Sequence, residues 1–328
     1  MRDKISVIIP VYNVKSYINQ CFYSFLKQTY DNFEIIFVDD CSDDGSAEII
    51  LNLKNKYPQI VRLIKHAVRG NAAKARNTGI LASEGEWLAF CDSDDWVSED
   101  YLSSLYNAAA VTDADIAIST SIFYYYSDRK IKKVNTGFSL DSDSSHKEIV
   151  AFFRSNSGSK IFRKSFVTDS GILFPDDLWR GEDHGFVLPL VTKTEKIALI
   201  DKPMYYYRQR MDSNSNINFT DTDLSFYLKS IQTAEDSSNA GFETELEFRA
   251  VSELLYGMVM VMVRAGKSKE EIYEHIDFFN LRYPDWKKNQ YLFGLNRAKR
   301  LFIYFADKKM YFMIKFLIFG WDMLNKFN

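Results

Sequence analysis

The sequence is poor in cysteine. Its 328 residues include only Cys21, Cys41 and Cys91, an odd number that is never spaced as CxxC. This scarcity argues against a disulfide framework and against a zinc knuckle. It indicates reduced thiols in a cytosolic compartment.

Long apolar runs are also missing. A membrane-spanning helix needs about 18 consecutive apolar residues, and the most apolar segment, 254–263, is much shorter and is better explained as a buried helix. The N-terminal apolar run, 5–11, ends in Pro-Val-Tyr-Asn without a small-residue cleavage site, so we expect no secretory signal. These features predict a cytoplasmic protein, either soluble or peripheral on the inner face of the cell membrane.

There is no excess of positive charge. Lys and Arg number 41 against 44 Asp and Glu, a formal net charge of −3, which argues against a nucleic-acid partner. Hydrophobic residues make up 46% and charged residues 26% of the chain, values typical of globular proteins. The chain length favours two domains or one large one. Aromatic residues, at 16%, are the unusual feature of the composition.

The first 120 residues alternate apolar strand-like runs with amphipathic helical segments. The predicted strands are 5–11, 33–40, 61–66, 86–95 and 114–120, and the predicted helices are 17–26, 46–57, 72–83 and 99–110. Strands that are apolar throughout and alternate with helices are typical of an α/β fold, with a mainly parallel sheet covered by helices on both faces.

The remainder of the chain is less regular. A polar stretch, 121–160, is interpreted as an insertion or connecting segment. Residues 178–191 lead from a loop into a helix, and 196–210 contain one or two short strands. Helical spacing then returns in 222–238, in 242–265 (closed by Gly266) and in 268–280.

Polar residues follow three of the predicted strands. They are Pro10–Asn13, Asp39–Asp40 and Asp92–Asp95. Sheets of this kind bind ligands outside the carboxyl ends of their strands. The three groups are therefore predicted to converge on one edge of the sheet and to form a binding site.

The acidic segment Asp92-Ser93-Asp94 could carry chemistry. If the segment is extended, one carboxylate can face a sugar hydroxyl while the other binds Mg²⁺ or Mn²⁺, which prefer few carboxylates plus phosphate oxygens. Such a metal would neutralise charge on a departing diphosphate. The alternative is a turn that starts the next helix at Asp95.

Two further segments lie near the same edge. The repulsion between Asp39 and Asp40 favours a role in binding hydroxyl or imide donors of a nucleoside, although the residues that follow could simply cap the next helix. Lys74 and Arg76 could meet an anion near a helix N-terminus, or form a solvated basic face. The segment around Lys74 and Arg76, which begins at Gly70, matches neither the GxGxxG motif nor a Walker loop. Its sequence therefore argues against a dinucleotide-dependent dehydrogenase and against an NTPase.

A second acidic pair, Glu182-Asp183, follows a glycine and precedes a helix. One carboxylate could act as a general base while the other fixes an acceptor hydroxyl. The pair could equally be an ordinary helix start. Nearby Trp179 could stack on a sugar face or only pack.

In combination these motifs resemble a known family. VIIPVYN (7–13), VDDCSDDGS (38–46), ARNTGI (75–80), DSDD (92–95) and GEDHGF (181–186) occur in the order seen in family 2 glycosyltransferases of GT-A fold. Within that family, the motifs resemble those of the bacterial enzymes that build capsule, lipopolysaccharide and teichoic-acid sugars. The resemblance is strong over 1–120, moderate over 121–210, and fades beyond about 220.

The resemblance implies roles for individual residues. They are a nucleotide-binding set (Pro10, Tyr12, Asp40, Arg76 and Asp92), a metal ligand for manganese or magnesium (Asp94), a catalytic pair (Asp183 as base, Glu182 orienting the acceptor), acceptor contacts (Trp179 and Arg180) and a diphosphate contact (Arg208). In this assignment Tyr12 stacks on the base, Asp40 accepts from its imide, and Arg76 lies near the base or the diphosphate.

The implied reaction is an inverting transfer from a nucleotide-sugar donor, UDP-linked, to a hydroxyl of a glycan or lipid-linked glycan in surface polysaccharide synthesis. Residues 1–215 would form the catalytic domain and 216–328 a helical region. The QxxRW motif of the family's processive synthases is missing. Two alternatives stay open: a nucleotidyltransferase, and a non-catalytic nucleotide-sugar-binding protein.

The C-terminal segment 296–328 combines seven Lys and Arg with two Asp and many aromatic residues. A helix of this composition can lie in a membrane interface, with its cations reaching anionic lipids. The alternatives are a packed helical subdomain or a contact in a homo-oligomer.

Overall fold

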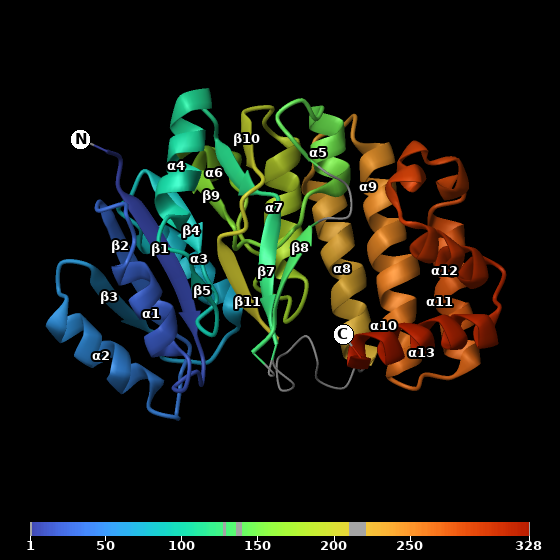
Figure 1. The fold of residues 1–328 in the computed structure, drawn as a ribbon, viewed down its shortest axis with the longest axis horizontal. Helices are drawn as coiled ribbons and strands as arrows, with labels where there is room; N and C mark the ends of the chain where they lie inside the picture. The colour runs from blue at the N-terminus through green and yellow to red at the C-terminus, as the bar shows by residue number, and fades with distance from the viewer. Residues whose placement is uncertain (1, 127–128, 136–139, 210–220, 328) are drawn as a thin grey trace.

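The computed structural model describes residues 2–126, 129–135, 140–209 and 221–327. A seven-stranded sheet in the order β10-β6-β9-β4-β1-β2-β3 forms its centre (Figure 1). The strands are β1 (Ile5–Val11), β2 (Phe33–Asp39), β3 (Val61–Lys65), β4 (Trp87–Phe90), β6 (Ile116–Ser119), β9 (Lys160–Arg163) and β10 (Ile197–Ile200). β9 runs antiparallel to both of its neighbours, and the other pairs are parallel. The predicted mainly parallel sheet is therefore confirmed.

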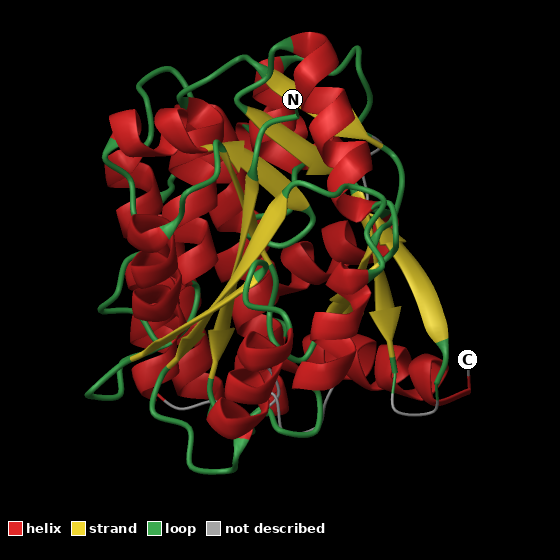
Figure 2. Ribbon diagram, turned by 90° about the vertical axis from the view of Figure 1, so that its left-hand side faces the viewer, coloured by secondary structure: helices red, strands yellow, loops and turns green. Residues whose placement is uncertain are grey.

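Helices cover both faces of this sheet, as predicted (Figure 2). They are α1 (Ile18–Leu26), α2 (Ser46–Lys56) and α4 (Tyr101–Thr112), and, on the opposite face, α3 (Ala72–Ala82), α6 (Lys164–Ser170) and α7 (Glu182–Thr192). The apolar residues of β1 explain why both faces are covered, because successive side chains of a strand point to opposite faces of the sheet. Val7 and Ile9 belong to one hydrophobic cluster, and Ile8 belongs to the other. Helix α3 approaches closely at Gly79, where a Cβ would lie 2.3 Å from Ile8 Cγ2.

A second sheet lies beside the carboxyl edge of the first. It contains β5 (Trp96–Val97), β11 (Tyr205–Arg208), β7 (Ser121–Tyr125) and β8 (Ile131–Asn135), in that order. β11 pairs antiparallel with β5 and parallel with β7. The predicted short strands within 196–210 correspond to β10 and β11.

Two sequence-based interpretations need correction. The expected strand 86–95 ends at Phe90, and Asp92–Asp95 form a turn in which the Asp95 amide donates to the Asp92 carbonyl at 3.0 Å. The acidic motif is therefore not extended. The segment 121–160 is also more than a connection, because it supplies β7, β8, helix α5 (His146–Phe152) and the first residue of β9. β9 is only four residues long, too short for its period to be recognised in a polar context.

The C-terminal region is helical, as predicted. It contains α8 (Asp221–Ser237), α9 (Glu243–Ala250), a π-helical segment η1 (Val251–Met258), α10 (Val259–Arg264), α11 (Lys269–Arg282), the 3-10 turns η2 (Trp286–Lys288) and η3 (Gln290–Gly294), α12 (Arg297–Asp307) and α13 (Tyr311–Phe327). Helices α9, η1 and α10 are continuous, and Gly266 with φ of +74° follows them.

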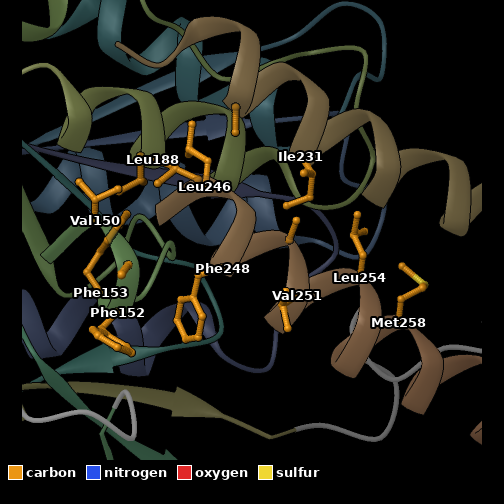
Figure 3. Packing of buried hydrophobic residues seen from close by; sticks show 14 of the residues in the cluster. Val150, Phe152, Phe153, Leu188, Ile231, Leu246, Phe248, Val251, Leu254 and Met258 are labelled. Carbon is orange, nitrogen blue, oxygen red and sulfur yellow. The ribbon is translucent and has the colours of Figure 1, made fainter. Parts of the chain in front are cut away.

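This region shares a core with the sheet. A single cluster of buried residues runs from Ile8 in β1 to Ile318 in α13. Figure 3 shows part of it, where Phe152, the last residue of α5, and the adjacent Phe153 lie opposite Phe248 of α9. The expected domain boundary at 215/216 lies outside the described residues. Within them, none of the helices is both long enough and apolar enough to span a membrane.

Candidate active site

A cavity of about 1060 Å³ opens at the carboxyl ends of the strands and extends to the C-terminal helices. Every residue to which the family resemblance gives a role lines it: Pro10, Tyr12, Asp40, Arg76, Asp92, Asp94, Trp179, Arg180, Glu182, Asp183 and Arg208. Asp39 and Lys74, the other two candidates, do not. The fold therefore brings together residues that are up to 198 positions apart, from Pro10 to Arg208. Their individual roles stay predictions.

The two carboxylates that follow β2 differ in their surroundings. Asp39 accepts from the Ser42 amide at 3.3 Å, which is the turn expected of a helix entry. Asp40 is buried, and its Oδ1 accepts from the Gly70 amide at 2.9 Å and lies 2.8 Å from His66 Nδ1. Only Asp40 lines the cavity, where its orientation is fixed by these contacts.

An arginine that the sequence analysis missed lies between two predicted aromatic residues. The Arg69 guanidinium carbon is 3.9 Å from the centroid of the Tyr12 ring and 5.6 Å from that of Trp179. Trp179 is half exposed, so it is not a core residue. Planar groups stacked in this way form a surface suited to a nucleobase or a sugar ring. The only sequence signal was the position of Arg69 beside Gly70.

The three carboxylates in the turn after β4 differ in their contacts. Asp95 is buried, and its carboxylate accepts from the Tyr205 hydroxyl at 2.7 Å and from the Arg208 amide at 2.8 Å. Arg208 Nε in turn donates to the Asp94 carbonyl at 2.8 Å. Asp95 therefore holds β11 against the turn through two hydrogen bonds, and all three carboxylates line the cavity.

The surroundings of Asp94 suit a hard divalent cation. Among the described residues, no group of three or more His, Cys, Asp or Glu side chains could hold a metal by itself. Magnesium and manganese at phosphate sites usually take one or two carboxylates and complete their coordination with water and phosphate oxygens. The oxygen ligands offered by Asp92 and Asp94 fit that requirement.

Arg76 of α3 lies at the centre of the acidic groups. It is 3% exposed, and its guanidinium donates to Asp92 Oδ1 at 2.7 Å and to Glu182 Oε1 at 2.8 Å. The alternative of a solvated basic face is therefore wrong for Arg76, although Lys74 on the same helix is exposed. Arg76 links the turn after β4 to the start of α7.

Helix α7 begins directly after Gly181, so Glu182 and Asp183 lie in its first turn. This glycine has φ of +76°, and a Cβ there would lie 2.8 Å from Ser230 Oγ, so both conformation and space require glycine. Glu182 and Asp183 then occupy the first helical turn, where the helix dipole favours negative charge. The pair is thus a helix start and also lines the cavity.

Asp183 has the properties of a general base. Burial raises the pKa of its carboxyl to about 6, with Glu182 and Asp92 acting in the same direction and Arg76 opposing them. Its Oδ1 is buried and has no hydrogen-bond partner among the described residues. A carboxylate with a pKa close to neutrality and an unused acceptor oxygen is suited to taking a proton from a bound hydroxyl.

Comparison with known proteins agrees with this geometry. The family described as Glycosyl transferase family 2 matches residues 6–170, half of the chain, which include the turn after β4. The chain belongs to glycosyltransferase family 2. It is 33% identical to glycosyltransferase GlyG of Streptococcus pneumoniae over 239 residues, which cover 69% of this chain and 76% of GlyG. It is 32% identical to GlyA of the same organism over 232 residues, 66% of this chain but only 32% of GlyA.

Solved structures confirm the GT-A fold. Residues 1–349 of Staphylococcus aureus TarS in complex with UDP align over 98% of this chain and 91% of that chain, with a TM-score of 0.65 and 20% identity. A mannosyltransferase of Pyrobaculum calidifontis, in complex with GDP-mannose and Mn²⁺, aligns over 94% of this chain and 86% of that chain, with a TM-score of 0.57 and 14% identity.

Proposed function

We propose that this family 2 glycosyltransferase moves a sugar from a UDP-linked donor to a hydroxyl of a glycan or lipid-linked glycan in surface polysaccharide synthesis, with inversion at the anomeric carbon. The observation that carries the proposal is Asp183, a carboxylate with one buried oxygen and a raised pKa, in one cavity with Asp40, Asp92 and Asp94. In support, a poly(ribitol-phosphate) beta-glucosyltransferase of Bacillus spizizenii is 30% identical over 64% of this chain and 33% of its own length.

The donor would lie at the strand ends. Tyr12 would stack on the base beside Pro10, Asp40 would accept from the imide, and Asp92 would contact the ribose. A divalent cation held by Asp94 would supply charge neutralisation for the departing diphosphate. Arg208, which is fixed to the Asp94 carbonyl, would lie beside that group. Arg76 would hold Asp92 in place.

The transfer would be a single displacement. Asp183 takes the proton of the acceptor hydroxyl as that oxygen forms a bond to the anomeric carbon. The bond from the anomeric carbon to the diphosphate oxygen breaks on the opposite face, and the nucleoside diphosphate leaves with the electron pair. Glu182, with Trp179 and Arg180 at the cavity wall, would orient the acceptor. No acid is needed for the leaving group, in contrast to glycoside hydrolysis.

The donor and metal assignments predict a specific ligand response. UDP-glucose or UDP-N-acetylglucosamine with Mn²⁺ should raise the melting temperature by about 5 °C at 100 times Kd, because ligand that binds only the native state stabilises it. In the Asp94→Asn variant the Mn²⁺-dependent part of the rise should disappear, whereas Asp31→Asn, at an exposed site on the loop before β2, should respond as wild type. A scan by differential fluorimetry measures both.

The same samples separate the alternatives. A nucleotidyltransferase would release pyrophosphate from a nucleoside triphosphate, and a non-catalytic binding protein would bind the donor but release no UDP with any acceptor or with water. A lack of response to every nucleotide sugar, including GDP-mannose, would contradict the donor proposal.

We also propose that the C-terminal helices bind an anionic membrane surface. Phe312, Phe316 and Phe319 are 80%, 69% and 65% exposed and recur at helical spacing along α13. The exposed Lys308 and Lys315 lie beside this stripe in the sequence. Apolar side chains flanked by cations are the features with which an interfacial helix enters the headgroup region.

Substitution of Phe316 by Asp should reduce this binding. With vesicles containing phosphatidylglycerol, we expect at least a tenfold lower bound fraction for Phe316→Asp and weaker binding of wild type at high salt. Leu281→Asp, at a more exposed site (83%) on α11, is the matched control and should bind as wild type. Equal co-sedimentation of all three proteins would overturn the membrane assignment.

A further inference from the structure

The cavity continues beyond Asp183 to charged residues that the proposed transfer does not use. Arg154 follows α5, Arg249 comes from α9, and Lys299 comes from α12. The carboxylate of Glu253, on η1, lies among them. Arg249, Glu253 and Lys299 come from the C-terminal helices. Arg154 lies between α5 and β9 and donates to the Tyr124 hydroxyl of β7 at 3.4 Å. The proposed donor contacts come chiefly from the carboxyl ends of the strands.

Arg249 is held in place with one donor unused. It is 7% exposed, and its guanidinium donates to the Phe153 carbonyl at 2.5 Å and to the Ser155 hydroxyl. Its Nε is buried and has no hydrogen-bond partner among the described residues. An unsatisfied buried donor is costly, so an acceptor oxygen from a ligand in the cavity would stabilise this arrangement.

Arg154 is close enough to Lys299 to influence its charge, and Arg249 contacts Phe153 and Ser155, the two residues that flank Arg154 in the chain. Burial lowers the pKa of Lys299, and the charge of Arg154 lowers it further, while Glu253 opposes the shift. Burial also lowers the pKa of Arg249, again with only Glu253 opposing. Like charges held together under partial burial repel, and a bound anion would remove that repulsion.

The charge balance along the cavity is uneven. At the end formed by the helices, three cations face the single carboxylate of Glu253, which also lies 3.9 Å from His184 Nε2. At the end formed by the strands, carboxylates outnumber cations among the described lining residues. Burial lowers the pKa of His184, which favours the neutral ring, while Glu253 opposes the shift. The helical end is therefore the part of the cavity suited to a second anion.

We propose that Arg154, Arg249 and Lys299 form a phosphate subsite, so that the acceptor carries a phosphate next to the hydroxyl that receives the sugar. Guanidinium and ammonium groups make short, charge-assisted hydrogen bonds to phosphate oxygens. The phosphate belongs either to a phosphodiester of a polyol-phosphate chain or to the diphosphate of a lipid-linked acceptor. This inference rests on the proposed transfer, because it places the acceptor hydroxyl at Asp183.

The test uses the full-length protein saturated with UDP and Mn²⁺, so that the donor site is occupied. Binding of inorganic phosphate, of a short glycerol-phosphate oligomer and of geranyl diphosphate is measured by calorimetry, with glycerol as the neutral comparison. We expect Lys299→Gln and Arg154→Gln each to weaken phosphate binding at least tenfold. Arg300→Gln, at the neighbouring exposed position on α12 that does not line the cavity, should bind as wild type.

The outcomes are distinct. If the oligomer binds more tightly than geranyl diphosphate, the phosphate is that of a polyol chain, and the reverse order indicates a lipid-linked diphosphate; equal binding shows recognition of the phosphate alone. If UDP binds but no phosphate compound does, or if Lys299→Gln and Arg300→Gln weaken binding equally, the subsite is overturned. If UDP itself fails to bind, the donor assignment fails instead. Lys299→Arg should restore binding, which a purely structural role would not predict.

Discussion

Replacing Asp183 by asparagine should lower kcat by about 10²- to 10⁴-fold while leaving donor affinity close to that of wild type. The amide cannot take the proton of the acceptor hydroxyl, whereas the proposed donor contacts at Tyr12, Asp40 and Asp92 remain. Release of UDP in the presence of acceptor measures turnover, and calorimetry with UDP measures donor binding. Asp183 is expected to act in the bond-forming step and not in binding.

The variant should also fold. Burial raises the pKa of Asp183, so the charged carboxylate is disfavoured in the native protein. A neutral amide removes that cost, and we expect a melting temperature at pH 7.5 equal to or above that of wild type. Asp176→Asn, at an exposed site on the loop before α7, is the matched control and should keep full activity. Turnover within a few-fold of wild type in Asp183→Asn would exclude this residue as the base.

The position of the site could be predicted from the sequence because it depends on where each strand ends, and the local sequence shows this. Each apolar strand ends in polar residues, and parallel strands place those ends at the same edge of the sheet. Strand pattern alone is therefore enough to place Pro10, Asp40 and Asp92 together. It is not enough to give the conformation of Asp92–Asp95, because a turn and a strand end in the same short polar residues.

The pairings across the cavity could not be predicted. Arg76 and Glu182 are separated by 106 residues, and nothing in the local pattern of either indicates its partner. The cluster of Arg154, Arg249 and Lys299 is even harder to predict from the sequence, because these residues come from segments without a recognised motif. Such contacts depend on how α7 and the C-terminal helices pack on the sheet, which periodicity alone does not determine.

Among these long-range contacts, we expect replacement of Arg76 to have the largest effect on stability and activity. In Arg76→Met, Asp92 and Glu182 lose their shared cation. Arg76 is buried but the Asp92 side chain is 42% exposed, so we expect the unfolding free energy to fall by about 2 kcal/mol, less than for a fully buried pair. Arg76 also holds down the pKa of Asp183, so that pKa should rise above 6 in the variant. Because the base acts only when deprotonated, kcat/KM at pH 7 should fall, by roughly tenfold for each unit by which the pKa exceeds 7. Urea unfolding and a pH–rate profile measure the two effects.

The pH profile of the Arg76→Met variant shows whether Arg76 acts on Asp183 or only stabilises the fold. Wild type should show an acid limb in kcat/KM near pH 6, and Arg76→Met should show it at higher pH, with activity partly recovered by alkaline buffer. Arg76→Lys, which keeps the charge, should leave the limb near its wild-type position. A loss of activity that is uniform across pH would contradict electrostatic coupling to Asp183. Strict additivity of the effects of Arg76→Met and Asp183→Asn on the activation free energy would also contradict this coupling. Two residues that act on the same proton transfer are expected to have non-additive effects.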